Sequence, residues 1–159
     1  MSLVDSGART EFNTGAMREI DECVKGRCDL LPLDIVAKIV PCGGDYDTDP
    51  IISNINRFIE TRGSAFLYHA INEFCFIREW TPATAMLELS IHFADGAKKY
   101  SPNNWRKGLP IYSFIDSGVR HYLKWLRGDT DEPHDRAFLW NMVCCIWTFR
   151  NKPEMMDIL

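Results

Sequence analysis

Ionisable side chains recur at helical spacing near the middle of the chain. They stand at positions i, i+4, i+7 and i+11 and comprise Glu88, His92, Asp95 and Lys99. On a helix these side chains share one face, and the opposite face is expected to carry an apolar stripe of Met86, Leu89, Phe93 and Tyr100. Carboxylates projecting from facing helices of a bundle are a common way to build a divalent-metal site. The alternative is an ordinary solvated helix face.

The passage "HFADGAKKYSPNNWRKG" (92–108) concentrates positive charge beside turn residues. Its cations are Lys98, Lys99, Arg106 and Lys107. Ammonium and guanidinium groups suit phosphate oxygens, and Trp105 either stacks on a base or pins the loop to the rest of the protein. Asn103 and Asn104 suit a turn and equally suit the edge of a base. The passage therefore predicts a polyphosphate-binding loop or, alternatively, a tucked tryptophan among solvated lysines.

The motif "DSGVRH" places Asp116 and Arg120 four residues apart, with His121 beside them. At that spacing the acid and the arginine face each other on a helix, where such pairs usually contribute a few tenths of a kcal/mol. In the functional interpretation Asp116 binds a metal ion and Arg120 binds a phosphate. Both interpretations remain open from the sequence.

The last apolar segment begins after "DTDEPHD" and contains two polar residues on one face. His134 and Asn141 stand seven positions apart, and polar groups buried on an apolar helix need partners. A satisfied core asparagine is the alternative to a binding residue. The adjacent pair His134-Asp135 also raises an HD-type phosphohydrolase, for which Asp157 is the available later acid.

The elements that must position these residues are helical. Five segments carry apolar residues at helical spacing, and they cover residues 50–63, 64–80, 81–100, 111–128 and 133–150. Pro50 opens the first and Gly63 closes it, while Ser64 and Thr81 are expected as N-caps. The last segment is apolar nearly all round, so we expect it at the centre. Residues 29–40 predict a short helix opening after Pro32.

Together these patterns predict an all-α protein, a compact bundle of about five helices in a single domain over residues 1–159. Residues 1–30 are expected to form an irregular N-terminal arm, 41–50 a loop, and 50–150 the helical core. No segment alternates convincingly with period two.

Composition limits the function. The chain has 159 residues and a formal net charge of −4, so duplex nucleic acid is not an expected partner. No apolar run is long enough to span a membrane, and we expect a cytoplasmic protein. The cysteines lack paired zinc-ligand spacing and are expected as free, mostly buried thiols at 23, 28, 42, 75, 144 and 145. Walker, GxSxG and HExxH motifs are absent, which leaves metal-and-cation handling of a phosphorylated small molecule.

The sequence resembles a phage-encoded family of dATP/dGTP diphosphohydrolases, N-terminal type, which is discussed beside the all-α MazG-like nucleotide pyrophosphohydrolases. The resemblance runs through "FNTGAMREI", "KGRCDLLP", "ELSIHFADGAKKYSPNNWRKGLP", "YSFIDSGVRHYLKWLRGDTDE" and "HDRAFLWNMVCCIWT". It implies hydrolysis of a purine deoxynucleoside triphosphate to monophosphate and pyrophosphate, with Mg²⁺ or Mn²⁺ as cofactor.

The resemblance also implies roles for individual residues. Metal binding falls to Glu88 and Asp116, with Asp95 and Asp131 as further candidates. The triphosphate would be neutralised by Lys99, Arg106, Lys107 and Arg120. The base would face Asn104 and Trp105, with Asn141 as a further substrate-binding residue. Hydrogen-bonding or acid–base roles fall to His92, His121 and His134.

Two other functions remain open. Because the ExxE and ExxD pairs of MazG-like enzymes are absent as such, the same pocket could sequester a nucleotide or a nucleotide-derived signal without turnover. Alternatively, the aromatic last helix, with Trp140 and Trp147, mainly packs an oligomer. By analogy with related bundles that complete their pockets across subunits, we expect a homo-oligomer, at least a dimer.

Overall fold

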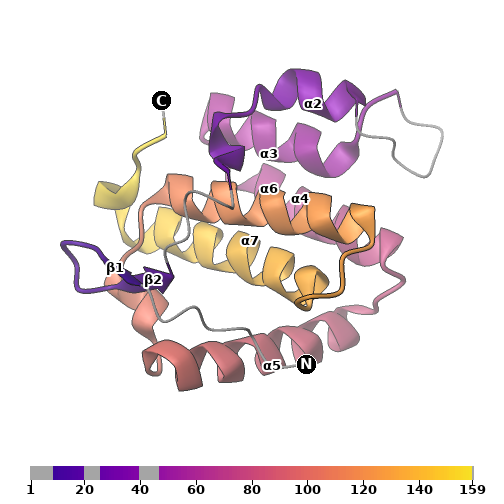
Figure 1. Cartoon of the computed structure of the whole chain (residues 1–159). Coiled ribbons are helices and arrows are strands. Elements are labelled where there is room, and N and C mark those ends of the chain that lie inside the picture. Colours follow the sequence, from indigo (N-terminus) through magenta and orange to yellow (C-terminus); the bar gives the residue numbers. More distant parts are fainter. Residues whose placement is uncertain (1–8, 20–25, 40–46, 159) are drawn as a thin grey trace.

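The computed structural model describes residues 9–19, 26–39 and 47–158, and within them the protein is mostly helical (Figure 1). The helices are α2 (Leu33–Ile39), α3 (Pro50–Thr61), α4 (Ala65–Ile77), α5 (Pro82–Tyr100), α6 (Ile111–Arg127) and α7 (His134–Asn151). Short 3-10 turns cover Cys28–Leu30, Asn104–Lys107 and Pro153–Met155. The predicted all-α bundle is confirmed, as is the short helix after Pro32.

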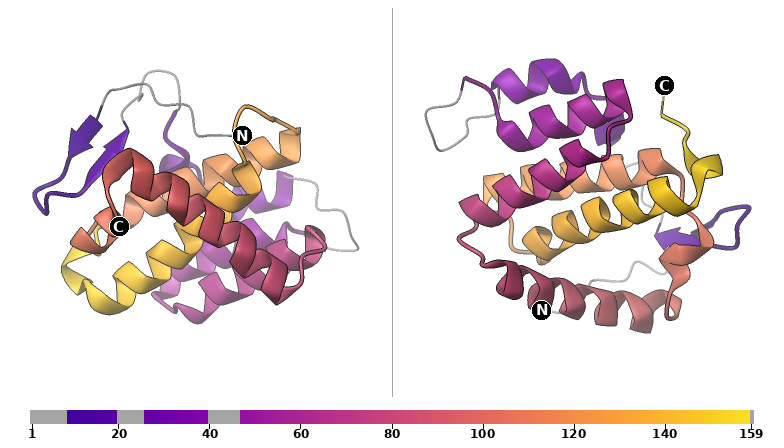
Figure 2. Two further views of the ribbon diagram at one scale, coloured as in Figure 1. Left: turned by 90° about the horizontal axis from the view of Figure 1, so that it is seen from below. Right: turned by 180° about the vertical axis from the view of Figure 1, so that it is seen from behind.

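Helices α6 and α7 form the centre of the bundle. Their contact is the most extensive between any two elements, and α7 also contacts α4 and α5. Helix α5 lies on one side of this pair, while α2 and α3 lie on the other (Figures 1 and 2). Gly118 is buried where α6 meets α7, and a Cβ there would collide with the end of the Met142 side chain. The central position predicted for the last helix is confirmed.

Aromatic rings fill the core between α4 and the central pair. The Phe74 ring lies 4.6 Å from Phe138 and 5.1 Å from Trp125, measured between centroids. Tyr122 packs beside them, and its hydroxyl donates to Asp49 Oδ2 at 2.6 Å. This aromatic cluster anchors α6 and α7, the helices that carry most of the candidate site.

Capping residues explain where two helices begin. Asp49 is fully buried and its Oδ1 accepts hydrogen bonds from the backbone of Ile51 and Ile52, so it caps α3 ahead of Pro50. Thr81 accepts from Thr84 N at 3.1 Å and caps α5 as predicted. The prediction for Ser64 was wrong, because its side chain makes no capping hydrogen bond and its backbone is already helical.

Helix α5 is rotated relative to the sequence prediction. The face with the ionisable residues was predicted to be either part of a metal site or solvated, and His92 on that face is only 8% exposed. Met86, assigned to the apolar stripe, is instead 52% exposed, and Leu87 and Ile91 share its outer side. Ala85 and Leu89 do pack inward, against Leu139 of α7. The ionisable residues of α5 therefore turn partly toward the interior.

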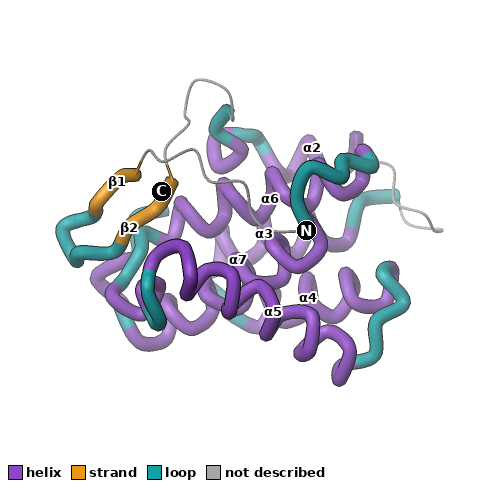
Figure 3. Tube along the Cα trace, turned by 60° about the horizontal axis from the view of Figure 1, so that its bottom comes forward, coloured by secondary structure: helices purple, strands orange, loops and turns teal. Residues whose placement is uncertain are grey.

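The N-terminal arm is more regular than predicted. Arg9–Glu11 (β1) and Met17–Glu19 (β2) form a two-stranded antiparallel hairpin, which Figure 3 shows beside loop segments at one end of the helices. The loop before α6 holds it there: Thr14 donates to the Gly108 carbonyl at 2.5 Å. Strands of three residues are too short to give a period-two signal.

The sequence also predicted free thiols and no membrane-spanning segment. Within the part of the chain that the structure describes, Cys144 and Cys145 are buried free thiols, whereas Cys28 and Cys75 are half-buried. Cys23, Cys42 and most of the predicted 41–50 loop lie outside the described residues. Among the described helices, none combines the length and apolar character that crossing a bilayer requires.

Candidate functional site

A cavity of about 510 Å³ opens where the N-terminal arm meets α5, the loop that follows it, α6 and α7. Cationic side chains dominate its charged lining, which consists of Arg18, Arg27, Lys99, Arg120 and Lys124 against Asp116 and Glu132. Its aromatic lining includes Tyr100, Tyr112 and Trp140. A volume of this size is typical of small-molecule sites.

Arg18 is the residue that sequence reasoning missed. It lies on β2, and its guanidinium donates to Ser113 Oγ and to Asn141 Oδ1, both at 2.9 Å. The Ser113 hydroxyl in turn donates to the Pro110 carbonyl. Burial lowers the pKa of Arg18, while the charge of Asp116 opposes that shift. Only the resemblance of "FNTGAMREI" pointed to this segment, because a lone arginine in an arm carries no periodic signal.

Asn141 lines the same cavity with its polar atoms satisfied. Its Oδ1 accepts from Arg18, and its Nδ2 donates to the Ala137 carbonyl at 2.8 Å. The buried Asn141 amide therefore holds the Arg18 guanidinium in place.

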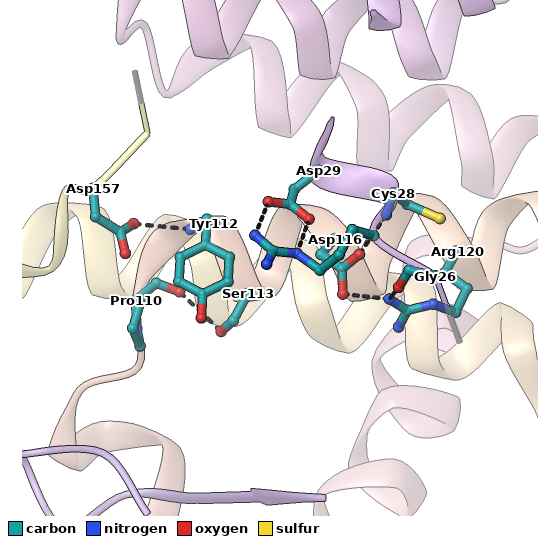
Figure 4. Close-up of polar contacts among 10 residues, drawn as sticks. Gly26, Cys28, Asp29, Pro110, Tyr112, Ser113, Asp116, Arg120 and Asp157 are labelled. Carbon is teal, nitrogen blue, oxygen red and sulfur yellow. Dashed lines mark hydrogen bonds and ion pairs between the residues drawn. The ribbon is translucent and has the colours of Figure 1, made fainter. Parts of the chain in front are cut away.

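Asp116 and Arg120 hold the segment that precedes α2 (Figure 4). The two side chains are ion-paired. Asp116 Oδ1 accepts from the Cys28 backbone N–H at 2.6 Å, and Arg120 donates to the Gly26 carbonyl at 3.0 Å. Both carboxylate oxygens of Asp116 are therefore engaged within the protein. Asp116 and Arg120 line the cavity, as a substrate-binding pair would, but they also close one wall of it.

Three of the predicted residues form a hydrogen-bonded row at the start of α7. The Nδ1 atoms of His121 and His134 lie 2.9 Å apart, and His134 Nε2 lies 2.8 Å from Asp131 Oδ1. Hydrogen bonds from His134 and then Lys124 lower the pKa of Asp131 to about 2. His121 lines the cavity, and burial, reinforced by His134, holds its pKa well below 6.5.

His92 reaches the cavity from α5. Its ring packs against Trp140 at 5.8 Å between centroids, and burial lowers its pKa to about 4. It is therefore a neutral imidazole at pH 7. Among the described residues its Nδ1 atom has no hydrogen-bond partner.

The loop residues predicted to face the base, Asn104 and Trp105, make contacts within the protein. Asn104 exchanges two hydrogen bonds with the Met17 backbone, at 3.1 and 2.9 Å, and so fixes the hairpin. Trp105 packs edge-on against Trp147, with ring centroids 5.0 Å apart, and also contacts Phe93. Both residues line the cavity, and both polar atoms of the Asn104 amide already hydrogen-bond the hairpin.

The predicted phosphate-binding cations divide into two groups. Lys99 and Arg120 line the cavity. Arg106 stacks on Trp105 and Trp147 instead, and Lys107 donates to the Gly15 carbonyl at 3.3 Å. Arg106 and Lys107 are not among the residues that line the cavity.

The predicted metal-binding acids do not come together. Glu88 pairs with Arg136 at 3.4 Å and Asp95 with Lys98 at 3.3 Å, while Asp116 is held as described. Within the described ranges, two groups of potential ligand atoms fall within 4.8 Å of one another. They are His121, Glu132 and His134, and Asp129, Asp131 and His134. Neither includes Asp135 or Asp157, the acids of the HD-type alternative.

The fold and site thus define a small helical protein with a cation-lined cavity between its central helices and its N-terminal arm. Residues 68–158, more than half of the chain, match the family model of the dATP/dGTP diphosphohydrolase, N-terminal family, and the protein belongs to that family. This confirms the resemblance stated from the sequence. No curated protein and no solved structure matches the chain.

Proposed function

We propose that this protein hydrolyses purine deoxynucleoside triphosphates, dATP or dGTP, to the monophosphate and pyrophosphate with the help of Mg²⁺ or Mn²⁺. Membership of the dATP/dGTP diphosphohydrolase family supports the reaction class. The observation that carries the substrate class is the charge of the cavity wall, where arginines and lysines from four different segments outnumber the acids. Such a wall suits a polyphosphate, whose oxygens accept charge-assisted hydrogen bonds.

Individual residues support distinct parts of this proposal. Arg18 and Arg120 present guanidinium groups, which can bind phosphate oxygens through two parallel hydrogen bonds. Tyr100 and Tyr112 line the cavity and offer ring faces on which a purine can stack. His92 is neutral, so it would donate or accept a hydrogen bond without adding charge. The protein thereby supplies binding, orientation and charge neutralisation.

A divalent ion would neutralise the phosphates further and lower the pKa of the attacking water. Such an ion needs free ligand atoms at the cavity wall. Among the described residues, the group of His121, Glu132 and His134 fits that need better than Glu88, Asp95 or Asp116, whose carboxylates are all engaged with cations or backbone amides.

The test is product analysis with the purified full chain. Each deoxynucleoside triphosphate is incubated with Mg²⁺, Mn²⁺ or EDTA, and the mixtures are separated by ion-exchange chromatography. Metal-dependent appearance of dAMP or dGMP together with pyrophosphate is the expected result. Pyrophosphate is distinguished from sequential phosphate release by adding inorganic pyrophosphatase after the reaction.

A second function is favoured by one observation, the engagement of Asp116 with Cys28 and Arg120. A cation-rich cavity with few free carboxylates could sequester a nucleotide without turnover. In that case the triphosphate at about one hundred times its Kd would stabilise the fold by about 2.7 kcal/mol, and chromatography would show no product. A flat thermal-shift screen together with no product would contradict both functions.

A further inference from the structure

Two imidazoles and one carboxylate meet beside the cavity, which His121 and Glu132 line, and away from Glu88, Asp95 and Asp116. We propose that His121, His134 and Glu132 bind one divalent transition-metal ion. The site itself can be tested without nucleotide. Only its role in hydrolysis rests on the proposed function.

The distance between the two imidazoles suits a shared ion. The Nδ1 atoms of His121 and His134 face each other at 2.9 Å. Two nitrogens bound at about 2.1 Å to one ion lie roughly 3.0 Å apart at right angles and roughly 3.4 Å apart in a tetrahedron. The two ring planes are inclined by 35° and the ring centroids are 5.2 Å apart. The rings therefore meet end to end through their Nδ1 atoms and are not stacked face to face.

Asp131 gives His134 the partner that metal-bound histidines usually have. A ligating histidine generally donates its other N–H to a carboxylate, which fixes the tautomer and the ring orientation. His134 Nε2 lies 2.8 Å from Asp131 Oδ1, so donation there leaves the Nδ1 lone pair aimed at His121. The His134 side chain is only 1% exposed, which holds the ring in place.

Glu132 supplies the third ligand and an opening to the substrate. Its carboxylate has no hydrogen bond or ion pair within residues 9–19, 26–39 and 47–158, and one of its oxygens lies within 4.8 Å of a ring nitrogen of each histidine. Glu132 and His121 both line the cavity. Three protein ligands with a side open to the cavity are the pattern of a catalytic rather than a purely structural metal site.

The donor set defines the class of ion. Imidazole nitrogens suit Zn²⁺, Fe²⁺ and the chemically similar Co²⁺, and the carboxylate also suits Mn²⁺, whereas Mg²⁺ prefers oxygen ligands alone. The neighbouring group around His134 is a weaker candidate because its acids are already paired. Asp129 is bound to Arg127, and Asp131 is bound to Lys124 at 3.0 Å.

The experiment measures metal binding by the full chain after chelator treatment. Co²⁺ and Mn²⁺ are titrated separately and followed by Co²⁺ d–d absorbance and by isothermal titration calorimetry, with Mg²⁺ for comparison. We expect one Co²⁺ or Mn²⁺ per chain and much weaker Mg²⁺ binding. Glu132→Gln and His121→Gln should each weaken Co²⁺ binding at least tenfold. Asp131→Asn should weaken it by about 10- to 100-fold through loss of the orienting hydrogen bond.

His69→Gln is the matched control, because His69 is exposed on α4 and belongs to neither group of potential ligands. Circular dichroism verifies that each variant is folded. Glu132→Gln changes a half-buried side chain with little change in shape, so it keeps the test valid if a histidine variant fails to fold. The proposal is overturned if the wild type binds no Co²⁺ or Mn²⁺, if Glu132→Gln and His121→Gln bind as the wild type does, or if Asp129→Asn abolishes binding while Glu132→Gln does not.

The two proposals fail separately. Intact metal binding without nucleotide hydrolysis would remove the proposed function alone. Hydrolysis by a chain that binds no transition-metal ion at His121, Glu132 and His134 would remove the metal site alone.

Discussion

Arg18 donates to the side-chain oxygen of Asn141, 123 positions further along the chain, at 2.9 Å. A guanidinium from the N-terminal arm is thereby seated on the central helix of the bundle. Because a polyphosphate is a stronger acceptor than a neutral amide, we expect the same guanidinium to contact a bound nucleotide.

Replacing this arginine should weaken nucleotide binding. Arg18→Ala removes a charged donor whose hydrogen bonds contribute about 1.5–3 kcal/mol each, so the Kd for dATP or dGTP should rise at least tenfold in isothermal titration. Arg57→Ala is the control, since Arg57 is an exposed arginine of α3 that stacks on Phe66 at 5.0 Å and does not line the cavity. Equal affinity in the two variants would contradict a nucleotide-binding role for Arg18.

Asp116 is expected to hold the segment that contains Gly26 and Cys28 in place. Asp116→Asn keeps one acceptor oxygen but removes the ion pair with Arg120, which frees the segment that contains Gly26 and Cys28. Hydrogen exchange at the Cys28 amide should accelerate roughly tenfold or more, a loss of about 1.4 kcal/mol of local protection. Asp29→Asn, which breaks only the contact with Arg27, should leave that amide protected.

Acid should destabilise the fold through His92. Its pKa is about 4 in the folded protein and 6.5 ordinarily. As the pH falls below 6.5, the unfolded chain therefore takes up a proton that the folded chain does not, and stability is lost progressively down to pH 4. The full loss is about 3 kcal/mol. Thermal unfolding between pH 7 and pH 4.5 should show a flatter slope for His92→Phe, and an unchanged slope would refute this assignment.

Asp49 should be one of the most sensitive positions for stability. Asp49→Ala removes the cap of α3 and the hydrogen bond that the Tyr122 hydroxyl donates to the Asp49 carboxylate. A lost cap costs about 1 kcal/mol and a lost hydrogen bond to a charged group about 1.5–3 kcal/mol, so urea unfolding should show a loss of about 2–4 kcal/mol. Asp49→Asn retains the capping oxygen and should lose clearly less.

The helices were predictable from the sequence because their signals are local. Pro50 and Thr81 mark helix starts by their own backbone and side-chain chemistry, and the long apolar pattern of α7 places it at the centre. Asp49 was missed since the sequence shows no sign of its second partner, Tyr122, which lies 73 positions later.

The site was harder to predict because it depends on how α5 is rotated about its axis and on contacts between residues far apart in the sequence. Residues 85–89 of α5 leave both faces partly apolar, so periodicity alone did not decide which face packs inward, and the structure turns His92 inward. The hydrogen bonds from Arg18 to Asn141 and from the Cys28 backbone to Asp116 join segments more than 80 residues apart. Spacing along one helix carries no information about such partners.

The hairpin and the segment of Gly26 and Cys28, which Asp116 and Arg120 hold, both precede position 68, where the family match begins. A fragment restricted to 68–158 would keep α5, α6 and α7, yet Tyr122 would lose Asp49 and Asn141 would lose Arg18. The family match therefore covers only part of the residues that build the core and the cavity. Here the short strand β2 contributes Arg18 to a cavity whose other lining residues lie mainly in α5, α6 and α7.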